Sequence, residues 1–431
     1  MLTVCGCMTP LAQVYVALYQ SSDPQNICAY SPGIWRCPNG RLLATMDIGS
    51  LRQNEKPNPD GSPKPAFEGL SCRVMTSDHS DEQWDTRADL DLYHARPFEA
   101  GGRLYVMGHR GDLRIARSTD NGTTWSDVST LTDGEFWHQA PANVWHANGC
   151  VYLVMERRVD KKVQGWYPSE LQPILMRARV TEDLTQPESW TMAVTPTFHD
   201  VVSDQGFDGF GIPFYPGNYP EVWKNQEANR HAAPLGWLET NVVQILDPNH
   251  VWHDPTGKTF HLWMRAHTGL TNYGMLARVK EAGPQPGEGE LEFSFETAPS
   301  GVRVQYLPLP GGQMKFHILH DETTKTYWLL SSQATDSMCR LDAMPDDRYG
   351  LPDNQRSRLQ LHFSTNMVDW NFAGIVAIGE TENCARHYAS MAIDGDDLIV
   401  LSRSGDRKAR SPHDTNMITL HRVTDFRALI Y

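Results

Sequence analysis

The stretch ARSTDNGTTWSDV (residues 116–128) decides the fold of this chain. Within it, Ser118, Asp120, Gly122 and Trp125 follow the spacing S-x-D-x-G-x-T-W. Ser and Asp side chains bind the backbone amides of a tight turn, and glycine supplies the positive φ that such turns need. The tryptophan that follows is large enough to pack between two sheets. We therefore interpret these four residues as a structural turn between strands and not as part of an active centre.

Six hairpin patterns surround this turn. Each consists of two apolar or alternating runs, most of them joined by Asn-Gly, Asp-Gly or Gly-Gly turn chemistry. They occupy residues 33–49, 95–109, 140–157, 241–266, 313–332 and 388–405. Most are followed by a further strand pattern, and units of this size are typical of β-propeller blades, which bury their faces against one another. The sequence therefore predicts an all-β, six-bladed propeller of four-stranded antiparallel blades.

The same pattern predicts a single domain over residues 1–431, because cutting a ring of blades would expose sheet edges. The last strand pattern, residues 416–426, needs an outer partner strand, and residues 13–20 can supply it and close the ring. Residues 197–236 are rich in glycine, proline and aromatic residues. We expect a long loop there that lies over one face of the propeller.

Composition narrows the classes of partner. The chain has 431 residues, a formal net charge of -14 and no long apolar run, so nucleic acid and membrane are not expected partners. It shows no P-loop, G-x-G-x-x-G or H-E-x-x-H motif, so we expect no cofactor and no metal. No signal peptide pattern is visible at the N-terminus, and the sequence leaves the cellular location and the oligomeric state open.

Ligands of a propeller are expected at a mouth of its axis, where the innermost strands begin. If the first strand of each hairpin is innermost, the polar residues at those starts and in the last loop converge there. Carboxylates and imidazoles in such a place suit acid–base chemistry, and arginine or lysine suits an acidic group. The candidate catalytic residues are Glu239, Asp414, His138, His94 and His413. The candidate substrate-binding residues are Lys315, Arg403, Asn241, His387, Arg96, Gln139 and Asn416.

The turn box and the repeated hairpins resemble the sialidase superfamily of propellers, the Asp-box or BNR-repeat glycoside hydrolases. The likeness covers roughly residues 10–427, with degenerate boxes near residues 78–84, 183–190 and 364–370. The resemblance implies an arginine triad for a substrate carboxylate, a Tyr/Glu nucleophilic pair and an aspartate acid/base. The family's first arginine belongs to an Arg-Ile-Pro-type segment of the first blade. In this chain that place reads Ser-Pro-Gly-Ile-Trp (residues 31–35), with no arginine before the proline.

Three functions follow from these residues. The first is a sialidase-like exo-glycoside hydrolase that removes a terminal sugar, with acidic sugars among the candidates, from a glycan or oligosaccharide, using Glu239 and Asp414 as its carboxylates. The alternative is a polysaccharide lyase on uronic-acid glycans, in which His94 or His138 works with Tyr388. The third is a non-catalytic propeller that binds carbohydrate.

Overall fold

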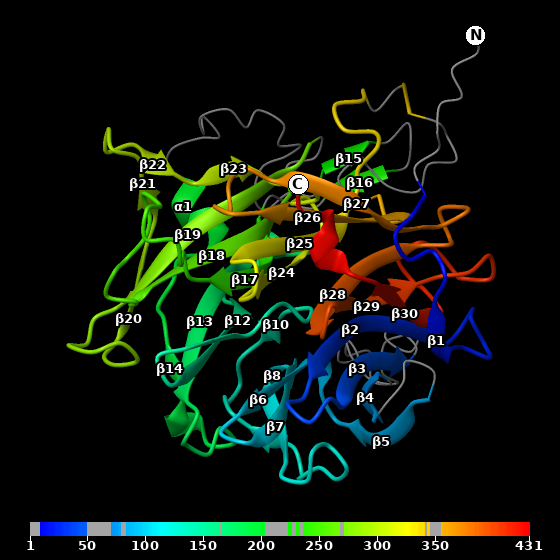
Figure 1. Cartoon of the computed structure of the whole chain (residues 1–431), viewed down its shortest axis with the longest axis horizontal. Coiled ribbons are helices and arrows are strands. Elements are labelled where there is room, and N and C mark those ends of the chain that lie inside the picture. The colour runs from blue at the N-terminus through cyan, green and yellow to red at the C-terminus, as the bar shows by residue number, and fades with distance from the viewer. Residues whose placement is uncertain are drawn as a thin grey trace.

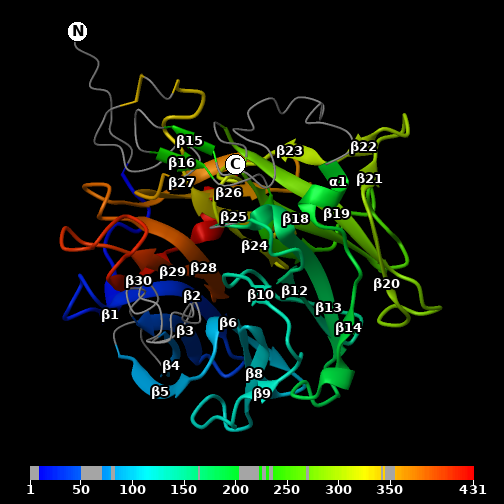
Figure 2. The ribbon, with the colours of Figure 1, turned by 180° about the vertical axis from the view of Figure 1, so that it is seen from behind.

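Six antiparallel sheets are arranged in a ring around a central axis (Figures 1 and 2). The computed structural model describes residues 9–49, 70–78, 83–163, 166–202, 223–225, 230–232, 236–267, 271–340, 343–344 and 355–431. Each sheet has a path of four strands, and in five of the six blades these strands follow one another along the chain. The predicted six-bladed, all-β propeller is therefore confirmed.

The first three blades follow the order of the sequence. Blade 1 contains β2 (Cys28–Arg36), β3 (Leu42–Gly49), β4 (Ser71–Ser77) and β5 (Asp85–Leu90). Blade 2 contains β6 (Tyr93–Ala100), β7 (Arg103–Arg110), β8 (Asp112–Ser118) and β9 (Ser129–Thr130). Blade 3 contains β10 (Trp137–His138), β12 (Cys150–Arg158), β13 (Leu171–Arg179) and β14 (Thr191–Met192), with β11 (Trp145–Ala147) also paired to β12.

The other three blades complete the ring. Blade 4 contains β17 (Trp237–Val243), β18 (Thr259–Ala266), β19 (Tyr273–Glu281) and β20 (Leu291–Ser294), with β23 (Tyr306–Pro308) beside β19. Blade 5 contains β24 (His317–Asp321), β25 (Thr326–Ser332), β26 (Arg358–Ser364) and β27 (Asn371–Ile378). Blade 6 contains β28 (Arg386–Asp394), β29 (Asp397–Ser404), β30 (Met417–Val423) and, from the N-terminal end, β1 (Val16–Gln20).

The ring is closed by strands from the two ends of the chain. β1 pairs antiparallel with β30, with Val16 opposite Leu420 and Gln20 opposite Met417. This is the closure that the sequence predicts for residues 13–20. It joins the N-terminal segment to the last blade and leaves no blade without its fourth strand.

Smaller elements lie outside the blade paths. They are α1 (Phe198–Val202), the hairpin of β15 (Trp223–Asn225) and β16 (Arg230–Ala232), the pair β21 (Glu296–Thr297) and β22 (Arg303–Val304), and the 3-10 turns η2 (Pro168–Glu170), η3 (Pro187–Ser189) and η6 (Phe426–Leu429). Most of the predicted loop 197–236 lies outside the described residues. No helix in the described part of the chain has the length and apolar character needed to cross a membrane.

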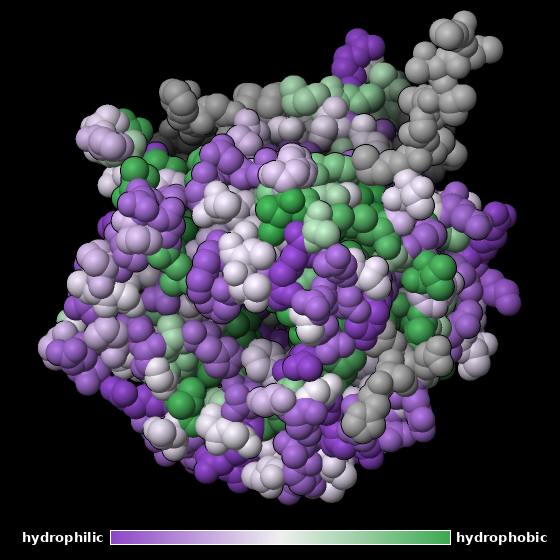
Figure 3. All heavy atoms as spheres, in the orientation of Figure 1, coloured by the Kyte–Doolittle hydropathy of each residue, from purple (hydrophilic) through white to green (hydrophobic). Residues whose placement is uncertain are grey.

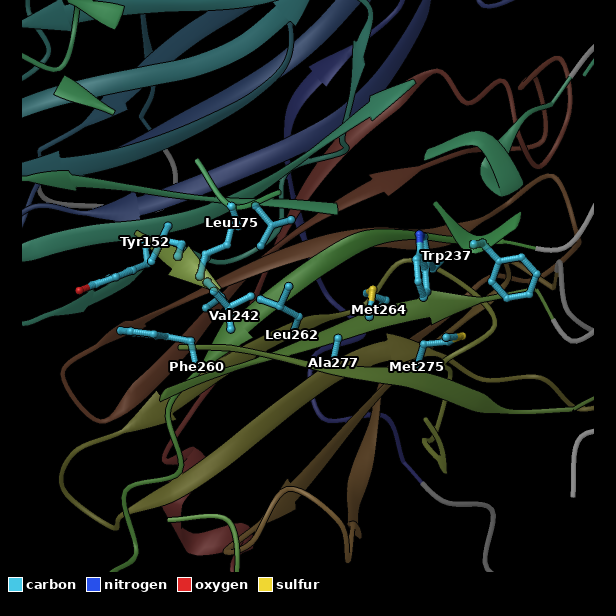
Figure 4. Packing of buried hydrophobic residues seen from close by; sticks show 14 of the residues in the cluster. Tyr152, Leu175, Trp237, Val242, Phe260, Leu262, Met264, Met275 and Ala277 are labelled. Atoms are coloured by element: carbon cyan, nitrogen blue, oxygen red, sulfur yellow. The ribbon is translucent and has the colours of Figure 1, made fainter. Parts of the chain in front are cut away.

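The hydrophobic core consists of clusters between neighbouring blades. Between blades 3 and 4, the rings of Tyr152 and Phe260 stack with centroids 4.0 Å apart, and Leu175, Val242 and Leu262 pack around them (Figure 4). All five side chains are fully buried. Burial of one large apolar side chain contributes roughly 1.5–3 kcal/mol, so the contacts between blades hold the ring together.

The turn box closes the connection between β8 and β9. The Ser118 hydroxyl accepts the amide of Gly122 at 2.8 Å, and Gly122 has φ +81°. The carboxylate of Asp120 accepts the amide and hydroxyl of Thr124 at 2.9 and 2.6 Å, and these bonds lower the pKa of Asp120 to about 2. Trp125 packs against the cluster between blades 1 and 2. All of these contacts serve the turn.

Candidate active site

Four of the innermost strands begin with the same distortion. β2, β6, β17 and β28 each shift register near their first residues, as a β-bulge does. Ser31, His94, Glu239 and Tyr388 occupy these bulges with φ of 47, 54, 55 and 50°. Positive φ costs a non-glycine residue free energy, and bulges redirect side chains beside active centres. The repeated bulge therefore marks this end of the axis as a candidate site.

A second set of polar residues lies on the neighbouring strand of the same blades. In the register of five blades, a buried polar residue of the second strand faces the start of the inner strand. These facing residues are Asp47, His109, Glu156, Arg265 and Arg403. Of these five residues, only Arg403 is among the site residues predicted from sequence. The signal that could have found the others is their position across each hairpin from a polar strand start.

Tyr388 is the centre of a cluster of polar side chains at this end of the axis. Nη1 of Arg265 donates to the Tyr388 hydroxyl at 2.7 Å and to Oε2 of Glu239 at 3.1 Å. Glu239 is also hydrogen-bonded to Tyr388. Burial raises the pKa of Tyr388, and Arg265 opposes that rise. A phenol, a carboxylate and a guanidinium group from blades 6 and 4 are thus in direct contact.

Three arginines surround the Tyr388 ring. The guanidinium carbons of Arg265, Arg356 and Arg403 lie 6.0, 5.4 and 5.2 Å from its centroid. Arg403 also lies over the ring of Tyr30 at 4.4 Å. Several cationic groups in one buried place produce a field that suits a carboxylate ligand. The sequence lacks an arginine at Ser31, and the structure brings Arg403 of blade 6 to the cluster.

Asp47 is suited to carry a proton. It is fully buried, and its carboxyl oxygens accept the amide of His94 at 3.1 and 3.0 Å. Burial raises the pKa of Asp47 well above the ordinary value of an aspartate, although the His94 amide lowers it. A carboxyl group held neutral in this way can act as a proton donor.

Asp414 has the opposite electrostatic environment. Burial alone would raise its pKa, but the hydrogen bond from His413 (2.8 Å), the charge of Arg403 and the Tyr30 hydroxyl (3.1 Å) keep the pKa of Asp414 below its ordinary value. Asp414 is therefore ionised near neutral pH. This environment favours a role for Asp414 in orienting His413 and compensating Arg403, in place of the proton transfer that we predicted from sequence.

Three histidines meet beside Asp47. Nδ1 of His94 lies 3.2 Å from Nε2 of His109, and the rings of His94 and His138 have centroids 5.1 Å apart. Burial lowers the pKa of all three, that of His138 to about 4. Trp166 contacts the His138 ring at 5.2 Å. The sequence predicts that His94 and His138 lie together, and the structure places them together as neutral imidazoles.

A measurement of stability against pH tests this burial. His138 is neutral in the folded state to about pH 4, whereas an unfolded histidine binds its proton near 6.5. Acid therefore favours unfolding, and the free energy of unfolding should fall as the pH drops through that interval, by about 1.4 kcal/mol per unit of pKa difference. In urea titrations, His138→Gln should reduce this fall by roughly 2–3 kcal/mol. Parallel pH curves for the two proteins would contradict the burial of a neutral imidazole.

Three predicted substrate-binding residues join neighbouring blades. The side-chain amide of Asn241 donates one hydrogen bond to the inner-strand backbone of blade 5 at 3.2 Å and accepts another from it at 3.0 Å. Nε2 of Gln139 donates to the carbonyl of Thr240 at 3.2 Å. Lys315 donates to Ser390 at 3.1 Å, and burial lowers its pKa to about 7. These side chains stabilise the ring, and their contact with substrate stays a prediction.

The remaining predicted binding residues are dispersed. Asn416 bonds both the amide and the carboxylate of Asp406 in its own loop, at 3.2 and 3.1 Å. His387 lies 2.9 Å from Nη1 of Arg356 and so belongs to the arginine cluster. Arg96 lies deeper along the axis and lines a cavity that opens at the other end. Its charge still interacts with Glu156 and with the predicted residue Lys315, and its contact with substrate stays a prediction.

Glu156 supports the bulge that carries Glu239. Its Oε1 accepts the amide and the hydroxyl of Thr240, the next residue, at 3.1 and 3.0 Å. Burial raises the pKa of Glu156 to about 8, although the hydrogen bonds from Thr240 oppose this rise. Asp47 supports the bulge at His94 in the same way. In both cases, a carboxyl group of the preceding blade binds the backbone that presents a candidate catalytic side chain.

Removal of this support should be costly. Glu156→Ala leaves two buried donors of Thr240 without an acceptor, and we expect the free energy of unfolding to drop by about 2–4 kcal/mol. Glu156→Gln keeps an acceptor oxygen and should lie within about 1 kcal/mol of the wild type. Urea titration of the three proteins checks this order. An equal loss for both variants would contradict the role of the acceptor oxygen.

No group of three or more His, Cys, Asp or Glu side chains in the described ranges is arranged to hold a metal ion.

No protein-family model and no curated protein sequence matches the chain, but solved structures match it in shape. The Hadza microbial sialidase Hz136 has a TM-score of 0.55 at 13% identity, over 95% of this chain and 68% of that one. A protein of unknown function from Dyadobacter fermentans has a TM-score of 0.52 at 10% identity, over 95% and 98%. The GH93 α-L-arabinofuranosidase of Fusarium graminearum, solved with arabinobiose, has a TM-score of 0.49 at 10% identity, over 96% and 98%. The chain thus shares its six-bladed propeller fold with this sialidase.

Proposed function

We propose that this protein is an exo-acting glycoside hydrolase that removes a terminal acidic sugar from a glycan. The contact of Tyr388 with Arg265 and Glu239, inside a ring of three arginines, carries this proposal. The shared fold with a sialidase supports it. A neutral phenol can approach an anomeric carbon that bears a carboxylate, where an anionic nucleophile would be repelled.

The first half of the reaction follows from this contact. The Tyr388 oxygen attacks the anomeric carbon while its proton passes to Glu239, and the bond from that carbon to the leaving oxygen breaks. Arg265 stabilises the negative charge that develops on the phenol oxygen. The product of this half is a glycosyl–tyrosine intermediate, an aryl glycoside bound covalently through the Tyr388 oxygen.

Asp47 supplies the second proton in our proposal. As a neutral carboxyl group it donates to the leaving oxygen in the first half of the reaction. In the second half its carboxylate removes a proton from water, which attacks the anomeric carbon, while the bond to the Tyr388 oxygen breaks and Glu239 returns its proton to that oxygen. Asp47 replaces Asp414 in this role because Asp414 is ionised and lacks a proton to give.

The substrate carboxylate is expected to lie among Arg265, Arg356 and Arg403. The neutral imidazoles of His94 and His138 can then exchange hydrogen bonds with sugar hydroxyls. The resulting preference is for a sugar with a carboxylate near its anomeric carbon, as in sialic acids and, with a longer reach, uronic acids.

A panel of fluorogenic glycosides tests the proposal. It should include a sialoside, a glucuronide, a galacturonide, an arabinofuranoside and a galactoside, with each acidic sugar also offered as its methyl ester. We expect turnover of at least one acidic glycoside and a loss of about tenfold or more for its ester, because the ester cannot form charge-assisted bonds to arginine. Turnover of neutral glycosides alone would contradict the acidic preference, and no turnover on the panel or on natural acidic glycans would contradict the hydrolase.

A lyase is the second candidate, and the cluster of neutral histidines favours it. A neutral imidazole beside a tyrosine could remove the proton next to a uronate carboxyl group while arginine neutralises that group. Elimination leaves an unsaturated uronate, which absorbs in the ultraviolet, whereas hydrolysis leaves a saturated sugar. Absorbance measured during digestion of a uronic-acid polysaccharide separates the two reactions.

A further inference from the structure

A cavity of about 390 Å³ opens at the other end of the propeller axis. It is lined by the later residues of five inner strands or their connections: 33–36, 96–97, 141–146, 317–320 and 390–393. The candidate active site lies at the starts of the same strands, so the cavity is at the opposite mouth. β30 ends on this side, η6 follows it in front of the strands in Figure 1, and this face is hollowed near the middle of the ring (Figure 3).

The walls of this cavity are mainly apolar. Ile34, Ile318 and Met391 line it deep in the axis and are buried. Nearer the opening, the rings of Trp35 and His146 have centroids 5.4 Å apart. Cavities of this size hold small molecules, and apolar walls with few polar groups favour a ligand with an apolar body.

One cationic group in the cavity lacks an ion pair. Arg96 is 1% exposed, and its Nη1 makes a long hydrogen bond of 3.4 Å to the carbonyl of Asn143. Its Nε and Nη2 have no hydrogen-bond partner among the described residues. Buried guanidinium groups are normally paired, because an unpaired one loses its hydration without compensation. Arg96 therefore needs an acceptor.

The other charged groups near the opening already have partners. Arg36 pairs with Asp394 at 2.6 Å, and Glu322 pairs with Lys325 at 2.8 Å. The carboxyl group of Glu156 also interacts with Arg96, but burial raises the pKa of Glu156 to about 8 and leaves it largely protonated at neutral pH. The net excess in the cavity is then the positive charge of Arg96, so charge complementarity calls for a single anionic group.

We propose that this cavity is a second ligand site, which binds a small monocarboxylate with an apolar or aromatic body. The carboxylate accepts from Arg96, the body lies against the apolar walls, and the aromatic rings at the opening cover it. A sugar fits less well because polar side chains of the walls such as Asn143, His317 and Ser390 already bond within the protein. The site is separate from the proposed catalytic centre and does not depend on hydrolysis.

Calorimetric titration of the full chain with benzoate tests this site, with benzamide as the neutral isostere. We expect benzoate to bind and benzamide to bind at least about tenfold more weakly, since it lacks the charge-assisted bonds. Arg96→Gln should abolish the preference for benzoate. Equal affinities for the two probes, an unchanged preference in Arg96→Gln, or no benzoate binding would overturn the proposal.

A second variant covers the case in which Arg96→Gln does not fold. Val144 lines the cavity and is half-buried, so Val144→Trp should fill the opening and weaken benzoate binding while leaving Arg96 intact. Glu239→Gln lies at the other mouth and should leave benzoate affinity unchanged. If Glu239→Gln weakens benzoate binding and Val144→Trp does not, the probe binds at the candidate active site and the second site is contradicted.

Discussion

Tyr388→Phe should lower kcat/KM for an acidic glycoside by about a thousandfold or more, because it removes the oxygen that forms the bond to the anomeric carbon. The loss should be mainly in kcat. The phenyl ring remains among the three arginines, so substrate binding and KM should change much less. The measurement is steady-state kinetics on the fluorogenic substrate with the highest turnover.

Tyr105→Phe is the matched control. Tyr105 is fully buried in blade 2, away from the strand starts, and its hydroxyl has no hydrogen-bond partner among the described residues. The variant Tyr105→Phe therefore loses a phenol oxygen but keeps the contact of Tyr388 with Arg265, and its kinetics should stay close to those of the wild type. Comparable losses in both variants would indicate a general effect on folding, and full activity of Tyr388→Phe would exclude Tyr388 as the nucleophile.

Asp47→Asn should lower kcat by about a hundredfold to ten-thousandfold on a natural glycan, in which the leaving oxygen needs a proton. On an aryl glycoside with an acidic leaving group the loss in the first half of the reaction should be much smaller, because little protonation is required. The wild-type rate should fall as the pH rises through the raised pKa of Asp47, and this fall should be absent from the variant.

Asp89→Asn provides the control for this substitution. Asp89 lies on β5 and pairs with Arg73 at 2.9 Å on the surface, so its loss should leave both the rate and the pH profile unchanged. If Asp47→Asn lowers kcat equally on the natural glycan and on the aryl glycoside, Asp47 supports the His94 bulge and is a positioning residue instead of the acid. The pH profile then retains the wild-type shape.

The fold is accessible from sequence because its signals are local. Hairpin turns and the spacing around Asp120 depend on residues a few positions apart, and they repeat in blade after blade. The closure by residues 13–20 follows from counting strands, since the last blade would otherwise lack one. Six hairpin patterns each indicate an antiparallel blade, so the prediction of a propeller does not depend on any one ambiguous pattern.

The site is harder to predict because its residues meet across hairpins and across the axis. Glu239 and the histidines stand at strand starts, where the pattern of the inner strands leads to them. Arg265 and Asp47 stand on second strands, within runs that otherwise have the apolar pattern of a buried core. Nor does the sequence show that both polar atoms of the Asn241 side-chain amide form hydrogen bonds to blade 5, because these bonds depend on the distance between the blades.

The central claim is that Tyr388 forms a covalent bond to an acidic sugar. The direct test is intact-protein mass spectrometry after incubation with a fluorinated acidic glycosyl fluoride, which forms the intermediate but hydrolyses slowly, followed by peptide mapping. We expect one added glycosyl unit on the peptide that contains Tyr388, and none in Tyr388→Phe. An adduct on another residue such as Glu239, or turnover of the reagent with no adduct at any time, would contradict it.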